Sequence, residues 1–142
     1  MEEMPKNYDP STNEPAILQK WLDGGYYKRR EGVGDCTVTI PPPNVTGKLH
    51  MGHATDDSIQ DAIIRMARMR GKSTRWVLGT DHAGIATQTK VDKKLKSEGI
   101  SRLEIGRDKF VDACWDWTHE YGGIIVEQIK RMGCSVDFDN ER

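Results

Sequence analysis

The chain has 142 residues, of which 36% are hydrophobic and 30% charged, and its 21 basic and 22 acidic residues leave a formal net charge of −1. This length and composition fit one compact domain, and the balanced charge excludes a domain-wide basic field that would attract nucleic acid. No stretch approaches the roughly 18 consecutive apolar residues of a membrane helix, and the N-terminus lacks an apolar signal core. We therefore expect a cytoplasmic chain without a membrane partner.

The chain contains three widely spaced cysteines, Cys36, Cys114 and Cys134. Their odd number and the lack of a Cys-x-x-Cys pair argue against a disulfide framework and against a zinc site. We therefore expect reduced structural thiols and no protein-bound zinc.

The first elements expected along the chain are a helix, a strand and a second helix. A capped helix is predicted over residues 13–25, where a Gly-Gly pair ends it, and the β-branched run 36–40 predicts a strand that three prolines terminate. Apolar residues then recur at steps of three and four over residues 59–69, which predicts a helix that ends at Gly71.

The second half of the chain is expected to hold a strand over 74–78, a helix over 85–96 that Gly99 closes, and a long helix whose apolar residues run over 110–132 and which Gly133 caps. The Gly122-Gly123 pair predicts a kink in the long helix or a close contact with another helix. A third strand is expected over 135–138. Strands joined by long helical connections predict an α/β fold with a parallel sheet and flanking helices.

One motif follows the first expected strand, in the segment Pro-Pro-Pro-Asn-Val-Thr-Gly-Lys-Leu-His-Met-Gly-His at 41–53. The strand brings the chain to the carboxyl edge of the sheet, where ligands bind in open α/β folds. His50 and His53 are then expected to open a helix, roughly 60° apart on one face, and a helix N-terminus suits phosphate oxygens. Gly52 leaves room for a base or ribose. The alternatives are chance surface histidines, or a metal site, for which no third ligand lies nearby.

A second motif, Gly-Thr-Asp-His-Ala-Gly-Ile-Ala-Thr-Gln at 79–88, also lies between an expected strand and a helix. It is therefore expected at the same sheet edge, facing the first motif. The carboxylate of Asp81 could hold an ammonium group or a ribose hydroxyl there. The alternative is that Asp81 only caps the helix.

At these two motifs the sequence resembles a known family. PPPNVTGKLHMGHA is similar to the HIGH-signature segment of class I aminoacyl-tRNA synthetases, in the form typical of the valyl members, and GTDHAGIATQ is similar to their second active-site segment. The resemblance covers nearly the whole chain from about residue 8. Met51 stands where Ile or Val is commoner and is expected to face the core.

The resemblance implies a Rossmann-like catalytic domain of which this chain holds the first half. Residues 1–35 would form an N-terminal extension with a short helix, and residues 36–142 would form the half domain. The editing, KMSKS and anticodon-binding regions of the family are not expected in it.

The function implied by the resemblance is ATP-dependent activation of valine to valyl-adenylate for attachment to tRNA(Val). His50 and His53 would act on the ATP phosphates as catalytic groups, and Gly52 would lie under the adenosine. Thr46 is a lesser candidate for binding ATP. Mg2+ is expected to accompany ATP.

For the amino acid, the resemblance implies that Asp81 holds the ammonium group of valine. Pro42 and Asn44 would shape the pocket, and His82 is a lesser candidate beside them. Two alternatives to catalysis by this chain stay open. One is a non-catalytic nucleotide-binding module, or a half that pairs with a complementary C-terminal half through its open sheet edge. The other is a small nucleotidyltransferase that acts on a different acceptor.

Overall fold

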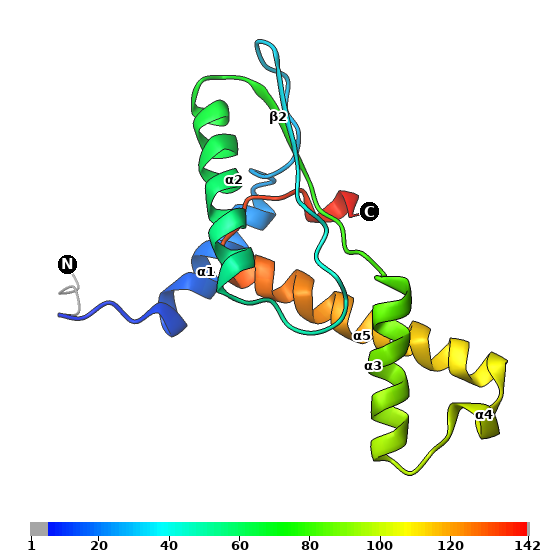
Figure 1. Ribbon diagram of the computed structural model, residues 1–142. Helices are drawn as coiled ribbons and strands as arrows, with labels where there is room; N and C mark the ends of the chain where they lie inside the picture. The colour runs from blue at the N-terminus through cyan, green and yellow to red at the C-terminus, as the bar shows by residue number, and fades with distance from the viewer. Residues whose placement is uncertain (1–5, 142) are drawn as a thin grey trace.

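The computed structural model describes residues 6–141. Its elements are α1 Pro10–Asp23, β1 Asp35–Thr39, α2 Met51–Met69, β2 Ser73–Val77, α3 Gly84–Ser97, α4 Arg102–Ile105, α5 Arg107–Arg131 and the 3-10 helix η1 Phe138–Asn140 (Figure 1). Within this described part, no helix is long and apolar enough to cross a membrane.

The first helix, α1, begins three residues earlier than expected. Asp9 is its N-cap, and one carboxylate oxygen accepts the backbone N–H of Ser11 at 3.0 Å. Pro10 follows at the first helical position, where its missing N–H costs no hydrogen bond. The Asp-Pro pair is thus the start signal, and Pro15 lies inside the helix.

The helix ends predicted from glycines are confirmed, and they share one geometry. At the end of α5, the left-handed Gly133 donates its N–H to Lys130 O at 2.9 Å, and the next N–H, of Cys134, reaches back to Ile129 O at 3.3 Å. This is a Schellman motif, which satisfies carbonyls that a helix end leaves unpaired. The ends of α1, α2 and α3 show the same pair of bonds around the glycines Gly25, Gly71 and Gly99.

The two strands pair in parallel, as predicted, with Asp35 opposite Ser73 and Thr39 opposite Val77. The helix α2 forms the crossover between them and packs on both strands. The long helix α5 contacts α3 and α4 with its first half, and its C-terminal end lies near α1 and α2 (Figure 1).

The third strand expected over 135–138 is not formed. Only one backbone bond joins this segment to β2, from Asp137 N–H to Trp76 O at 3.4 Å. Side chains of α2 take the backbone groups that a sheet ladder would need: Asp61 accepts the N–H of Ser135 at 3.0 Å, and Arg68 donates to its carbonyl at 2.8 Å. The segment is buried beside the sheet without joining it.

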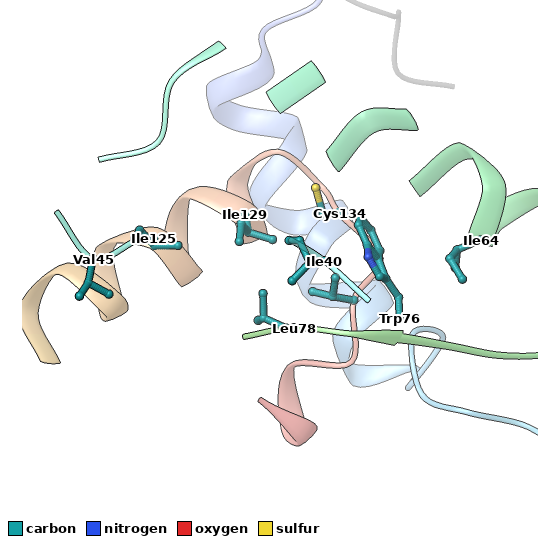
Figure 2. Packing of buried hydrophobic residues seen from close by; sticks show 9 residues of the cluster. Ile40, Val45, Ile64, Trp76, Leu78, Ile125, Ile129 and Cys134 are labelled. Atoms are coloured by element: carbon teal, nitrogen blue, oxygen red, sulfur yellow. The ribbon is translucent and has the colours of Figure 1, made fainter. Parts of the chain in front are cut away.

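The core lies on one face of this small sheet (Figure 2). Side chains alternate along β1, so that Cys36 and Val38 point to the core whereas Thr37 and Thr39 are exposed. The core cluster consists of Ile40, Val45, Ile64, Trp76, Leu78, Ile125, Ile129, Cys134 and Val136. Helices α2 and α5 therefore supply the cover for this face.

The apolar periodicity that identified α2 does not mark its buried side. Ile59, Ile63 and Met66 are 59%, 44% and 42% exposed, whereas Asp57 is buried. The inward side of α2 is mixed: Ile64 and Ala67 are buried, and polar side chains beside them hydrogen-bond the rest of the fold. Gln60, for example, accepts the indole N–H of Trp76 at 3.0 Å. Met51, which was expected to face the core, is 79% exposed, because it is the first residue of the helix and points away from the sheet-covering side.

Helix α5 is continuous through the glycine pair. Gly122 is buried, and a Cβ added there would meet Thr80 Oγ1 at 3.9 Å. This is an ordinary van der Waals distance to the loop that carries the second motif, so the close helix contact expected at the glycine pair is not found. Gly123 faces open space.

Candidate functional site

The two motifs meet where the strands end. Beyond β1 and β2, Asn44 and Asp81 form an isolated parallel bridge. Asp81 N–H donates to Pro43 O at 2.9 Å, and Val45 N–H donates to Asp81 O at 3.0 Å. The expectation that both motifs share one sheet edge is confirmed at the level of the backbone.

The histidines form a reciprocal cap at the start of α2. His50 is the N-cap residue, and its Nδ1 accepts the N–H of Gly52 at 3.1 Å. In return, Nδ1 of His53 accepts the N–H of His50 at 3.2 Å. The prediction that both residues lie on the helical face is corrected here, because His50 is extended and precedes the first helical residue. The ring centroids are nevertheless only 4.0 Å apart.

These bonds decide which ring nitrogen carries the proton. A neutral imidazole has one acceptor and one donor nitrogen, and Nδ1 is the acceptor in both His50 and His53. The proton must then lie on Nε2, which becomes a hydrogen-bond donor in each ring. The arrangement therefore offers two N–H donors beside a helix N-terminus, which carries a partial positive charge.

Burial and the nearby charge of His50 lower the pKa of His53 below its usual value. This favours the neutral ring that the cap requires. Gly52 lies against the ring of His50. A Cβ at this position would stand 2.9 Å from Cε1 and 3.0 Å from Nδ1 of that ring. The glycine thus makes room for the cap, whereas we expected it to make room for a ligand.

The second motif contains a strained turn. Ala83 precedes α3 in a left-handed conformation with φ of 52°, which is uncommon for residues other than glycine. Oδ1 of Asp81 accepts the N–H of Ala83 at 3.0 Å and so supports this turn. The carboxylate is exposed and has further acceptor positions. Asp81 therefore stabilises the turn ahead of α3 and can still accept bonds from a ligand.

The other candidates lie in different surroundings. Pro42 and Asn44 are exposed at the sheet edge, and Thr46 is half-buried in the loop that leads to the histidines. His82 is turned toward α5, where its ring meets the edge of Trp115 at a centroid distance of 5.2 Å. These two residues line a hollow of about 320 Å³ between α3 and α5.

Two residues of α5 contact the first motif and were not among the predicted site residues. Trp117 Nε1–H donates to Val45 O at 2.8 Å, and Gln128 Oε1 accepts the N–H of Leu49 at 2.9 Å. Gln128 occupies an apolar position in the helical repeat of α5. A polar residue in this row of apolar residues is the one sequence feature that points to Gln128.

Comparison with known proteins defines the class of this chain. Residues 16–142 match the family described as tRNA synthetases class I (I, L, M and V), and the chain belongs to this family. Valyl members of the family match it over nearly its whole length. A valine–tRNA ligase of Lactiplantibacillus plantarum is 50% identical over 142 residues, which are 99% of this chain and 16% of the relative.

Two further valine–tRNA ligases agree. That of Streptococcus pyogenes serotype M28 is 50% identical and that of Fusobacterium nucleatum subsp. nucleatum is 48% identical, each over 144 residues and all of this chain. The chain spans 16% of the length of each relative. It therefore corresponds to a part of these enzymes.

A solved structure supports the fold. The leucyl enzyme agnB2 LeuRS of Agrobacterium radiobacter K84, in a ternary complex with tRNA and LeuAMS, superposes with a TM-score of 0.76 at 20% identity. The match covers 96% of this chain and 16% of that one. The α/β arrangement described above is thus that of part of a class I synthetase.

Proposed function

We propose that this chain is the first half of a valine–tRNA ligase catalytic domain and takes part in forming valyl-adenylate from valine and ATP. The observation that carries the proposal is the reciprocal cap of His50 and His53 at the start of α2. It lies on the carboxyl side of a parallel sheet, where α/β folds bind their ligands. Attachment to tRNA(Val) would follow in the complete enzyme.

The chemistry assigned to the histidines is stabilisation of charge on the ATP phosphates. When the valine carboxylate attacks the α-phosphorus, the bond to pyrophosphate breaks and negative charge develops on the phosphate oxygens. In this proposal the Nε2–H groups of both rings donate to such oxygens, and the positive end of the α2 dipole adds to the stabilisation. Mg2+ would enter with ATP as its counter-ion.

The valine ammonium group is assigned to Asp81. Its exposed carboxylate is held by the Ala83 turn, so little side-chain entropy remains to be lost on binding. Asn44 is bridged to Asp81 through the backbone, which fixes the amino-acid end relative to the first motif. Pro42 and Asn44 would border the pocket, and Thr46 and His82 are assigned only neighbouring positions.

Valine-dependent exchange of pyrophosphate into ATP tests this proposal. We expect exchange with valine and little with isoleucine, and a loss of about a hundredfold or more in His53→Ala. His119→Ala is the matched control, because His119 is an exposed histidine on α5. Equal activity of His53→Ala and His119→Ala would refute the role given to the histidine.

A second candidate function is that of a half that works only with a complementary half. The exposed stripe of Ile59, Ile63 and Met66 on α2 favours it, because exposed apolar patches mark interaction surfaces. If so, the chain alone would show no exchange, and a complementary C-terminal fragment would restore it. Lysine at both Ile59 and Ile63 would prevent this rescue while the chain stays folded, and rescue by the double variant would exclude the surface.

A further inference from the structure

The loop 45–49 joins the bridged strand end to His50, so its conformation sets where the histidines stand. Within the described residues, one backbone hydrogen bond holds it, from Val45 N–H to Asp81 O at 3.0 Å. The other fixed points of the loop are made by side chains of α5.

Trp117 holds the start of the loop. Its indole N–H donates to Val45 O at 2.8 Å, and Val45 is fully buried. The indole itself is fixed, since it stacks on Tyr121 at a centroid distance of 4.2 Å. The carbonyl of Val45 is thus satisfied by a donor that cannot easily move away.

Gln128 holds the end of the loop. Its Oε1 accepts the N–H of Leu49, the residue directly before His50, at 2.9 Å. The neighbouring Ile125 and Ile129 are fully buried in the core, so the helix segment that carries Gln128 is anchored. Only one peptide unit separates this bond from the histidine cap.

The spacing of the two anchors fits the helix. Trp117 and Gln128 are 11 residues apart on α5, and about 11 residues make three turns, so both side chains leave the same side of the helix. The two loop residues that they bind are the first and last of the segment 45–49. Helix α5 therefore spans the loop and fixes both of its ends.

We propose that Gln128 is a positioning residue for the adenylate-forming reaction, acting through Leu49 on the His50–His53 cap, with Trp117 as its partner at the other loop end. The part of this proposal that concerns the reaction rests on the function proposed above. Without the Gln128 bond, the backbone at Leu49 gains freedom and the bond from His50 N–H to His53 Nδ1 loosens. The Nε2–H donors then meet the phosphate less often in a productive orientation. The rate of the reaction therefore falls more than the affinity for substrate.

The test compares four variants of the full chain. Gln128→Met keeps the length of the side chain but removes the acceptor, and Gln128→Glu keeps an acceptor oxygen. Trp117→Phe removes the donor to Val45 O and keeps an aromatic ring on Tyr121. Gln19→Met is the matched control, since Gln19 is exposed on α1 and its side-chain bond among the described residues goes to Asp23 in the same helix.

Two readouts are needed: valine-dependent exchange kinetics, and the NMR signals of the His50 and His53 rings. We expect Gln128→Met to lower kcat about tenfold, as loss of one hydrogen bond can do, with KM for valine nearly unchanged and both ring signals shifted. Gln128→Glu should restore most of the rate, and Gln19→Met should change neither readout. Should Gln128→Met not fold, Trp117→Phe carries the same expectation.

Unshifted ring signals in Gln128→Met and Trp117→Phe would overturn the proposal, as would equal damage from Gln128→Glu and Gln128→Met. Failure of the proposed function would give a different result from failure of the positioning role. The unaltered chain would then show no valine-dependent exchange, even with a complementary fragment. The ring signals would still decide whether Gln128 positions the histidines.

Discussion

Asp61 on α2 accepts two hydrogen bonds from Ser135, a residue that lies 74 positions further along the chain. One comes from the backbone N–H at 3.0 Å and one from the hydroxyl group at 2.5 Å. Arg68, two turns along the same helix, donates to the hydroxyl and to the carbonyl of Ser135. The C-terminal segment is therefore attached to α2 by ionised side chains, whose hydrogen bonds are stronger than those between neutral groups.

Replacement of Arg68 by methionine should therefore destabilise the fold. The guanidinium group also donates to Thr74 Oγ1 at 3.1 Å and to Tyr27 O at 3.2 Å, so its loss removes the donor from acceptors on several buried residues. We expect Arg68→Met to lower the free energy of unfolding by about 2–4 kcal/mol. Urea unfolding measures this, and Arg70→Met, at an exposed site, should stay within about 0.5 kcal/mol. Equal effects of the two variants would contradict the network.

Asp57 should oppose folding at neutral pH. Burial, with a smaller effect of the charge on Asp56, raises the pKa of Asp57 to about 6. The folded chain then holds a proton that the unfolded chain has released, so stability falls as pH rises from about 4 to about 6 and the penalty is complete above that.

Asp57→Asn removes this penalty. We expect the variant to be more stable than the unaltered chain by roughly 1–3 kcal/mol near pH 7.5, and the difference to vanish near pH 4. Asp112→Asn, at an exposed site on α5, serves as the control. A difference that does not depend on pH would show that ionisation of Asp57 is not its cause.

His53 should have a pH effect of opposite sign. Because burial lowers its pKa in the folded chain, the unfolded chain takes up a proton first as pH falls below about 6.5. The contribution of His53 to stability is fully present above that pH and decreases below it, since protonated Nδ1 cannot accept the N–H of His50. His53→Gln keeps an acceptor at this capping position without a titrating ring. Denaturation curves from about pH 5 to pH 8 should show that the acid-linked loss is smaller in the variant.

Gly52→Ala should separate stability from nucleotide binding. The new Cβ would force the His50 ring away and break its bond to the N–H of residue 52, while alanine favours the helix by about 1 kcal/mol. We expect little change in the melting temperature and weaker ATP binding by calorimetry. Gly123→Ala, where a Cβ meets open space, should stabilise the chain by about 0.5–1 kcal/mol and leave ATP binding unchanged. Unchanged ATP affinity in Gly52→Ala would argue against a role of the cap in binding.

Sequence reasoning worked best where a few neighbouring residues decide the outcome. Glycines close α2, α3 and α5 because a left-handed residue lets the last carbonyls of a helix be satisfied locally. Parallel pairing of two short strands followed from the helix between them. That both motifs share a sheet edge followed from the same geometry.

It failed where a distant segment competes for the same groups. The run 135–138 has the composition of a strand, yet Asp61 and Arg68 bind the backbone groups of Ser135 that a sheet would use. The stripe of Ile59 and Ile63 has the spacing of a buried face, yet the side of α2 that carries Ile64 is the one that packs. Neither result can be derived from residues that are close in sequence.

The sequence by itself determined the family, the two motifs and the position of most elements, because these depend on local spacing, turn residues and strand order. Tertiary structure alone decided that His50 caps α2, which side of this helix is buried, and that Trp117 and Gln128 reach the loop before the histidines. The physical reason is that a hydrogen bond between distant residues forms only after the core has brought their helices together. The roles of these side chains in the fold therefore do not follow from their positions in the sequence.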